Sequence, residues 1–176
     1  MLPFQQGALD SLCGIYCIIN AERIINRVTR EESEDLFNKI IRFLSRERLL
    51  EEILTRGMLL KDLTMILDEV VGERIPSRDL YWRNKTTPTL DKFWTSLESF
   101  LDGTPERAVI LGLNGVYDHW TVIKRITSNQ IDLYDSDLLK RLPRAYCTTI
   151  ETKGKRRHLL RPAQTYFLSG AKTIGY

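Results

Sequence analysis

The chain has 176 residues, of which 43% are apolar and 28% charged, so it can form one folded domain with a core of ordinary size. Its longest apolar runs are only a few residues, such as 109–111, and these predict no membrane span. The N-terminus lacks the basic and apolar regions of a secretory signal. We therefore expect a cytoplasmic protein, or one delivered to another cell's cytosol without a signal peptide.

Three cysteines and two histidines limit the metal and redox chemistry of the chain. An odd, low number of cysteines argues against a disulfide framework and favours a reduced compartment. The cysteines and histidines lack the paired spacing of zinc ligands, and no glycine-rich nucleotide-binding motif is present. We therefore expect neither a metal nor a cofactor.

The first hundred residues carry mainly helical patterns. Residues 12–26 repeat apolar side chains at helical spacing, and Asp10 or Ser11 can cap the start of that helix. Thr29, followed by two acids in the next turn, is a second start signal. In chain order, the predicted helices cover residues 12–26, 29–44, 47–55, 59–71 and 91–101.

After Gly103 the pattern changes from helices to strands. Residues 127–130 form a turn signal between two apolar segments and predict a hairpin. Residues 76–88 contain two prolines and several turn formers, and they predict a loop. The predicted strands cover residues 107–113, 119–126, 131–134, 146–150 and 165–168.

This order of elements predicts an α+β fold with a single domain over residues 1–176. The helical N-terminal half should pack on an antiparallel β-sheet formed by the C-terminal half. Within this plan, residues 29–102 form a helical insert or lobe, and residues 104–170 form the sheet.

Cys13 opens the first predicted helix and is followed directly by Gly14. Backbone N–H groups at a helix N-terminus stabilise negative charge, and the thiolate is the nucleophilic form of cysteine. We expect Gly14 to keep bulk away from the sulfur, so that a substrate carbonyl can approach. The Cys13 N–H and an upstream glutamine, Gln5 or Gln6, can donate hydrogen bonds to an oxyanion.

His119 starts one predicted strand and Asp135 follows the next, so the hairpin would bring the two side chains together. A histidine at a strand edge beside a loop is fixed yet reachable, as a general base must be. A carboxylate that accepts from one imidazole nitrogen fixes the tautomer and stabilises the imidazolium. Asp132 and Asp137 are alternatives to Asp135, which can instead simply cap a turn.

The order Cys, His, Asp, with the cysteine on the first helix, resembles the papain-like cysteine peptidase superfamily. The motifs are most similar to those of peptidase domains that process bacteriocin leaders, which run Gln…Asp-Cys-Gly, then His-aromatic, then Asp-Pro. The resemblance covers about residues 4–136. The matching residues are Gln6, Asp10, Cys13-Gly14, His119-Trp120 and Asp135-Ser136.

The resemblance implies a papain-like fold and a role for each matching catalytic residue. Cys13 would be the nucleophile, His119 the base and Asp135 the group that orients His119. Gln6 would be the oxyanion donor, because its seven-residue spacing to Cys13 fits the family better than that of Gln5.

The chain departs from the family pattern at three places. Two residues separate Asp10 from Cys13, where the family usually has them adjacent, and Ser136 stands where the family has proline. The segment 29–102 has no counterpart in the family. It should shape substrate choice, so the family's substrate does not carry over.

Three further residues have structural interpretations. Cys17 lies one helical turn after Cys13 and should belong to the core, because Cys-x3-Cys lacks the usual spacing of a redox pair. Trp120 should be part of the core or of a pocket wall. His158 lies in a basic loop and should be exposed.

The segment 140–161 carries eight Lys or Arg and one acid, in a chain with a net charge of +3. It can bind an acidic partner, or it can be a solvated turn between two strands. No aromatic stacking pattern or nucleic-acid motif accompanies it, so a nucleic-acid partner is not expected.

The sequence therefore predicts a cysteine peptidase-like hydrolase that cleaves a peptide or isopeptide bond of a protein or peptide substrate through a thioester. One alternative is a glutamine deamidase or transglutaminase-like effector that acts on a partner protein. Another is a non-catalytic binding module that uses the basic segment 140–161 on a papain-like scaffold.

Overall fold

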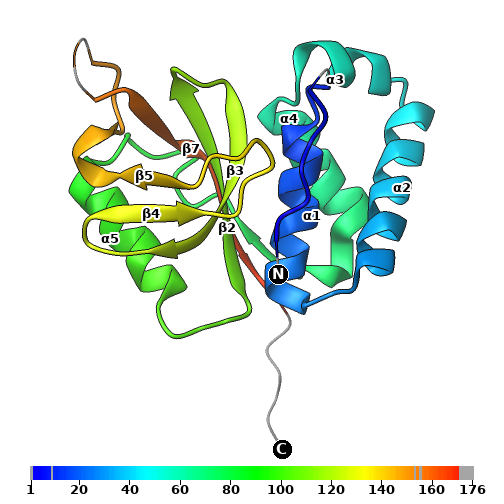
Figure 1. Ribbon diagram of the computed structural model, residues 1–176, viewed down its shortest axis with the longest axis horizontal. Coiled ribbons are helices and arrows are strands. Elements are labelled where there is room, and N and C mark those ends of the chain that lie inside the picture. Colours follow the sequence, from blue (N-terminus) through cyan, green and yellow to red (C-terminus); the bar gives the residue numbers. More distant parts are fainter. Residues whose placement is uncertain (1, 9, 153, 155, 171–176) are drawn as a thin grey trace, which may run out of the picture.

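The computed structural model describes residues 2–8, 10–152, 154 and 156–170, which fold as an α+β protein (Figure 1). These residues form five α-helices and one open sheet of seven strands. The strands run in the order β1-β7-β2-β3-β4-β5, with all neighbours antiparallel, and the short β6 pairs with β7 in parallel. The predicted fold class, α+β with an antiparallel sheet, is confirmed at this level.

The α-helices are α1 Cys13–Asn26, α2 Arg30–Arg46, α3 Leu50–Arg56, α4 Leu60–Ile66 and α5 Leu90–Leu101. The strands are β1 Ser77–Asp79, β2 Arg107–Gly115, β3 His119–Ile126, β4 Gln130–Leu133, β5 Arg141–Pro143, β6 Cys147–Thr148 and β7 His158–Ser169. Three short irregular helices complete the order: η1 Leu67–Val71, η2 Gly72–Arg74 and η3 Arg144–Tyr146.

The sheet separates two apolar cores, one on each face. Successive side chains of a strand point to opposite faces, so along β2 Ala108 and Ile110 join the core around α1, whereas Val109 and Leu111 join the core around α5. Figure 1 shows α1 to α4 gathered on one side of the sheet and α5 on the other. The molecule therefore has three layers, with the strands in the middle.

Helix α1 is the central element of the first core. Ten of its fourteen residues are buried, so it is enclosed nearly all round by the sheet and by the other helices. Its buried charge Glu22 accepts a hydrogen bond from Arg74 at 2.6 Å, which offsets the cost of burying a carboxylate. A rigid, buried helix thus carries Cys13 at its first position.

The predicted helices agree with the structure where the apolar spacing is regular. Thr29 caps α2, and it forms a reciprocal capping box with Glu32. The helix expected over 47–55 begins only at Leu50, and the one expected over 59–71 is α4 continued by the π-helix η1. The expectation that Asp10 or Ser11 caps α1 is wrong: the N-cap is Leu12, which makes no side-chain cap.

The segment 29–102 is distributed over the whole molecule. Helices α2 to α4 lie with α1, strand β1 joins the edge of the sheet, and α5 covers the opposite face. The loop predicted over 76–88 is wrong at Ser77–Asp79, which pairs with the end of β7. These three residues have no apolar alternation, so only the partner strand makes them extended.

The C-terminal strands also differ from their predicted bounds. The strand expected over 165–168 is the twelve-residue β7, and β5 was not expected at all. The strand expected over 146–150 shrinks to Cys147–Thr148. In the part of the chain that the structure describes, no helix has both the length and the apolar character needed to cross a membrane.

Candidate active site

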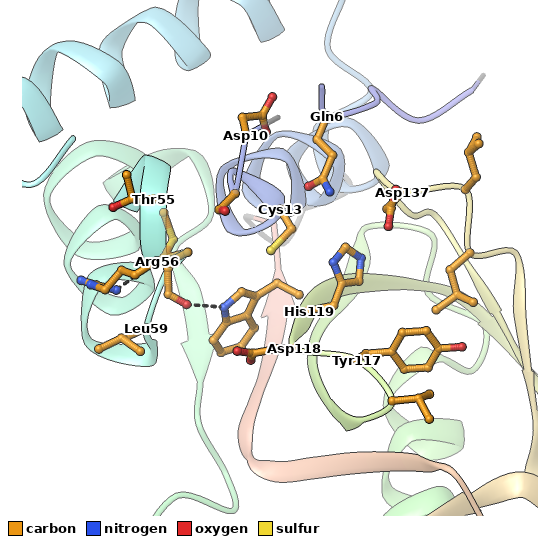
Figure 2. Close-up of a pocket in the computed structure, with 17 residues that line it drawn as sticks. Gln6, Asp10, Cys13, Thr55, Arg56, Leu59, Tyr117, Asp118, His119 and Asp137 are labelled. Atoms are coloured by element: carbon orange, nitrogen blue, oxygen red, sulfur yellow. Dashed lines mark hydrogen bonds between the residues drawn. The ribbon is translucent and has the colours of Figure 1, made fainter. Parts of the chain in front are cut away.

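A cleft of about 610 Å³ opens between the start of α1, the connection from α3 to α4 and the loops around β3 (Figure 2). Cys13, His119 and Gln6 line it, and Asp135 lies behind His119. The N-terminal segment that carries Gln6 and Cys13 is far in sequence from the hairpin that carries His119 and Asp135, and packing of α1 on β3 brings the two together.

Cys13 is the first residue of α1 and is 8% exposed, so only a small part of it faces the cleft. The N–H groups of the first helical turn have no carbonyl partner within the helix, and they favour an anionic sulfur beside them. A Cβ on Gly14 would lie 2.6 Å from the Met58 sulfur. Gly14 is therefore required for the close packing of Met58, which is a different reason from the substrate access expected from the sequence.

His119 is the first residue of β3, and it lies between Asp135 and Cys13. Its Nε2 donates to Asp135 Oδ2 at 2.7 Å, and Figure 2 shows the Cys13 side chain close to the His119 ring. Burial alone would lower the pKa of His119, but the hydrogen bonds and negative charges of Asp135 and Cys13 raise it to about 10. The site therefore favours the charged imidazolium form of His119.

Asp135 follows β4 and is only 3% exposed. Its second oxygen, Oδ1, accepts from the backbone N–H groups of Asp137 at 2.8 Å and Leu139 at 3.1 Å. Burial would raise the pKa of Asp135, but the hydrogen bond and charge of His119 and the backbone donors lower it. Both oxygens of the Asp135 carboxylate thus accept hydrogen bonds, and these bonds fix the orientation of the carboxylate toward His119.

The two alternative carboxylates have other positions. Asp132 lies on β4, and its Oδ2 accepts hydrogen bonds from Arg125 Nε at 2.9 Å and from Arg125 Nη2 at 2.7 Å. Asp137 is exposed at the mouth of the cleft. Of the three candidate acids, the structure pairs only Asp135 with His119.

Two neighbouring glutamines have separate tasks. Gln5 Nε2 donates to the backbone carbonyl of Asp135 at 3.0 Å, so Gln5 holds the loop that carries the carboxylate. The Gln6 side chain lies in the cleft, where Figure 2 shows it next to Cys13. Its Oε1 is buried without a hydrogen-bond partner among the described residues.

The N-terminal segment that carries both glutamines is held by backbone contacts. Phe4 N donates to Asn20 Oδ1 at 2.9 Å, Asn20 Nδ2 donates to Phe4 O at 3.1 Å, and Gln6 N donates to Ser136 O at 3.0 Å. Asp10 accepts from Gly7 N at 2.7 Å and shapes the loop before Cys13. Hydrogen bonds between this backbone and a side chain or carbonyl elsewhere in the chain leave no pattern in the sequence.

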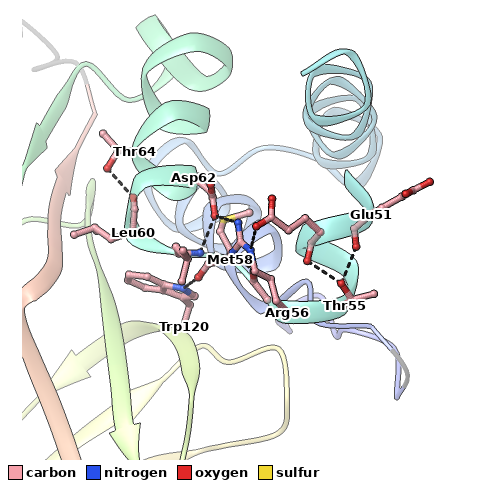
Figure 3. Close-up of polar contacts among 11 residues, drawn as sticks. Glu51, Thr55, Arg56, Met58, Leu60, Asp62, Thr64 and Trp120 are labelled. Carbon is pink, nitrogen blue, oxygen red and sulfur yellow. Dashed lines mark hydrogen bonds and ion pairs between the residues drawn. The ribbon is translucent and has the colours of Figure 1, made fainter. Parts of the chain in front are cut away.

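The opposite wall of the cleft depends on a polar network that sequence reasoning missed (Figure 3). Buried Asp62 accepts from Arg56 Nη2 at 2.8 Å and from Leu59 N at 2.9 Å. Trp120 Nε1 donates to the Met58 carbonyl at 2.7 Å, so the indole is both core and pocket wall. Segment 56–62 is thereby fixed against the strand that carries His119.

The remaining cysteines and the second histidine lie outside the cleft. Cys17 and Cys147 are buried free thiols, and burial raises the pKa of each, that of Cys147 to about 12. Cys17 is therefore a core residue, as expected. The expectation for His158 is wrong: it is buried and stacks on Tyr117 with ring centroids 5.6 Å apart.

The basic segment 140–161 runs from β5 through η3 and β6 to the start of β7, away from the cleft lining. Arg144 in this segment forms an ion pair with Asp91 at 2.8 Å. Lys153 and Lys155 lie outside the described residues. Among the residues that are described, no cluster of three or more His, Cys, Asp or Glu side chains could hold a metal ion.

No protein family, curated protein or solved structure matches this chain. What the protein does must therefore be inferred from the side chains in the cleft and from the elements that position them.

Proposed function

We propose that this protein is a papain-like thiol hydrolase that cleaves a peptide or isopeptide bond of a protein substrate. The observation that carries the proposal is the position of His119, which lies beside the Cys13 side chain in the cleft (Figure 2) and pairs with Asp135 at 2.7 Å. A nucleophile, a base and a group that orients the base are the parts that acyl transfer needs.

In the proposed reaction, the Cys13 thiolate attacks the carbonyl carbon of the scissile amide, and the carbonyl oxygen becomes an oxyanion. The Cys13 N–H and the Gln6 amide donate hydrogen bonds to that oxygen. The tetrahedral intermediate collapses, the C–N bond breaks, and protonated His119 gives its proton to the leaving amine. A thioester then links the acyl group to Cys13.

Water completes the cycle. His119, now neutral, removes a proton from water as the oxygen attacks the thioester carbonyl. The C–S bond breaks, the carboxylic acid product leaves, and the thiolate–imidazolium pair is restored. Asp135 keeps the imidazole in one tautomer and stabilises its charged form through both steps.

The arrangement of elements supports a papain-like scaffold. A buried helix presents the cysteine at its N-terminus, and two neighbouring antiparallel strands, β3 and β4, present the histidine and the aspartate from the other side of the cleft. The candidate oxyanion donor comes from the segment just before the helix.

The first test is the alkylation of each cysteine by iodoacetamide at a series of pH values, read by mass spectrometry in the wild type and in His119→Ala. We expect rapid alkylation of Cys13 near pH 6, where an ordinary thiol with a pKa of about 8.5 is almost fully protonated. His119→Ala should remove this reactivity. If Cys13 reacts as slowly as the buried thiols of Cys17 and Cys147, the result would contradict the proposal.

A peptide mixture then separates the possible reactions. New peptide termini that appear with the wild type and not with Cys13→Ala identify a hydrolase of amide bonds. Ammonia release without chain cleavage would instead identify a glutamine deamidase, which uses the same thioester. Binding of a partner by both forms, with no turnover, would identify a binding module.

A further inference from the structure

The cleft is acidic in a basic protein. The whole chain has a net charge of +3, yet Asp10, Asp118 and Asp137 line the cleft, whereas Arg56 is the only Lys or Arg among its lining residues. Arg56 is already paired with Glu52 at 2.7 Å and with Asp62 at 2.8 Å. Its charge is therefore not free to attract an anionic ligand.

Two of these carboxylates face solvent at the mouth. Asp118 comes from the loop before β3, Asp137 comes from the loop after β4, and both side chains are exposed. Neither forms an ion pair with any residue that the structure describes. His119 carries the opposite charge beside them, but it lies deeper in the cleft and is paired with Asp135 at 2.7 Å.

Apolar side chains surround the same opening. Leu59, Val116 and Leu138 line the cleft while they are 51%, 60% and 73% exposed. Leu138 has a φ of 62°, an unfavourable conformation for a bulky residue, in the turn that gives two N–H groups to Asp135. Large apolar side chains held in water at the mouth of a cleft offer a surface for apolar groups of a ligand.

We propose that the cleft selects an extended peptide segment in which a lysine or arginine lies next to an apolar residue at the scissile bond. This inference rests on the proposed hydrolase function and names its substrate class. The cation pairs with Asp118 and Asp137, and the neighbouring apolar side chain covers Leu59, Val116 or Leu138. A segment with an acid in place of the cation is repelled by the same carboxylates.

Affinity probes test the selection without knowledge of the natural substrate. The probes are acetylated dipeptidyl acyloxymethyl ketones that contain leucine and one variable residue, in both orders, with lysine, norleucine or glutamate at the variable position. The Cys13 sulfur displaces the acyloxy group, which leaves as a carboxylate, and a thioether forms. Mass spectrometry gives the second-order rate constant for each probe at Cys13.

We expect the lysine probe to react about ten times faster than the glutamate probe at low salt, with norleucine between them, because each close charge pair at the surface contributes a few-fold. Asp118→Asn with Asp137→Asn should reduce the ratio to about one. Raising the salt concentration to about 0.5 M should also reduce it, since salt screens exposed charges.

The matched control is Asp79→Asn with Asp102→Asn, which changes the net charge equally at two exposed acids outside the cleft lining. It should keep the wild-type ratio. Equal rates for the lysine and glutamate probes, or a ratio that responds equally to the control pair, would overturn the charge selection. If Cys13 still reacts with iodoacetamide in a His119-dependent way, the hydrolase proposal survives that result; without such reactivity, both proposals fail.

Discussion

At the residue scale, the ion pair of His119 and Asp135 is the most strongly perturbed part of the site. His119 has its pKa raised from 6.5 to about 10, and Asp135 has its pKa lowered from 3.8. Each group is stabilised in its charged form by the other across 2.7 Å in a largely buried position. Such a pair affects stability as well as reactivity, because a pKa that differs between folded and unfolded chains makes stability depend on pH.

The pH dependence can be measured in a Cys13→Ala background, which removes the titration of the thiol. It also removes the part of the His119 pKa increase that Cys13 contributes, so that the remaining increase comes from Asp135. A raised histidine pKa stabilises the fold fully below pH 6.5, and this stabilisation is lost as pH rises through the folded-state value. The lowered Asp135 pKa stabilises the fold above about pH 3.8, and this part is lost as pH falls. The pair should therefore stabilise most between about pH 4 and 6.5.

Urea unfolding of Cys13→Ala, with and without His119→Gln, gives the difference in free energy of unfolding. We expect this difference to be largest near pH 5.5 and to shrink steadily toward pH 9 and above. A difference that grows with pH would show that His119 is held neutral in the fold, contrary to the contacts with Asp135.

At the element scale, short segments define the cleft walls through a few buried polar contacts. The connection from α3 to α4 has no regular hydrogen-bond ladder, and Asp62, Arg56 and Trp120 hold it through side chains. Helix α2, in contrast, is remote from the cleft and is stabilised by its own capping box. A substitution in the Asp62 network should therefore affect both stability and the cleft, whereas a substitution in the α2 capping box should affect stability alone.

Asp62→Ala should destabilise the fold by about 1–3 kcal/mol, because Leu59 N and Arg56 lose their buried acceptor. It should also slow alkylation of Cys13 by the peptide probes, because the wall that carries Leu59 loosens. Thr29→Ala is the control: loss of the capping box should cost about 1 kcal/mol and leave the alkylation rate unchanged. Equal loss of probe reactivity in both variants would show that Asp62 acts through stability alone.

At the scale of the whole molecule, the sheet lies between two apolar cores. One core contains α1, which carries Cys13, and the other contains α5, which does not line the cleft. Ile110 and Leu111 are neighbours on β2 and are both fully buried, but they point to opposite faces. The face of Ile110 packs against α1, which carries Cys13. The face of Leu111 packs against α5, which contributes no residue to the cleft lining.

Ile110→Ala and Leu111→Ala should each lower the free energy of unfolding by about 2–5 kcal/mol, measured with urea. Only Ile110→Ala should change the alkylation rate of Cys13 in the native state, because the cavity that this substitution leaves would lie in the core around α1. A change of similar size in Leu111→Ala would mean that the two layers are coupled through the strands.

Much of this organisation could be predicted from local patterns. The alternation over 119–126 and the turn signal at 127–130 predicted the β3–β4 hairpin, and that hairpin is sufficient to place Asp135 near His119. The apolar spacing of 12–26 placed Cys13 at the start of a helix. The apolar periodicity and the short turn are properties of each segment itself. These elements could therefore be predicted without knowing which distant segments they pack against.

Other features depend on partners that are distant in the chain. Three such features have no local signal: the extended conformation of Ser77–Asp79, the burial of His158 against Tyr117, and the hydrogen bond from Gln5 to the Asp135 carbonyl. Each arises from contacts across many residues that form only when the chain has folded.

Local patterns in the sequence predicted most of the helical segments, the central hairpin and the types of side chain that could perform thiol chemistry. The sequence favoured Asp135 and Gln6 but left their alternatives open. The folded structure shows that Asp135 pairs with His119 and that Gln6 lines the cleft, and it alone shows that the cleft is acidic and rimmed by apolar side chains. Periodicity is a property of neighbouring residues. The shape and charge of a cleft, in contrast, come from segments that are brought together when apolar surfaces are buried.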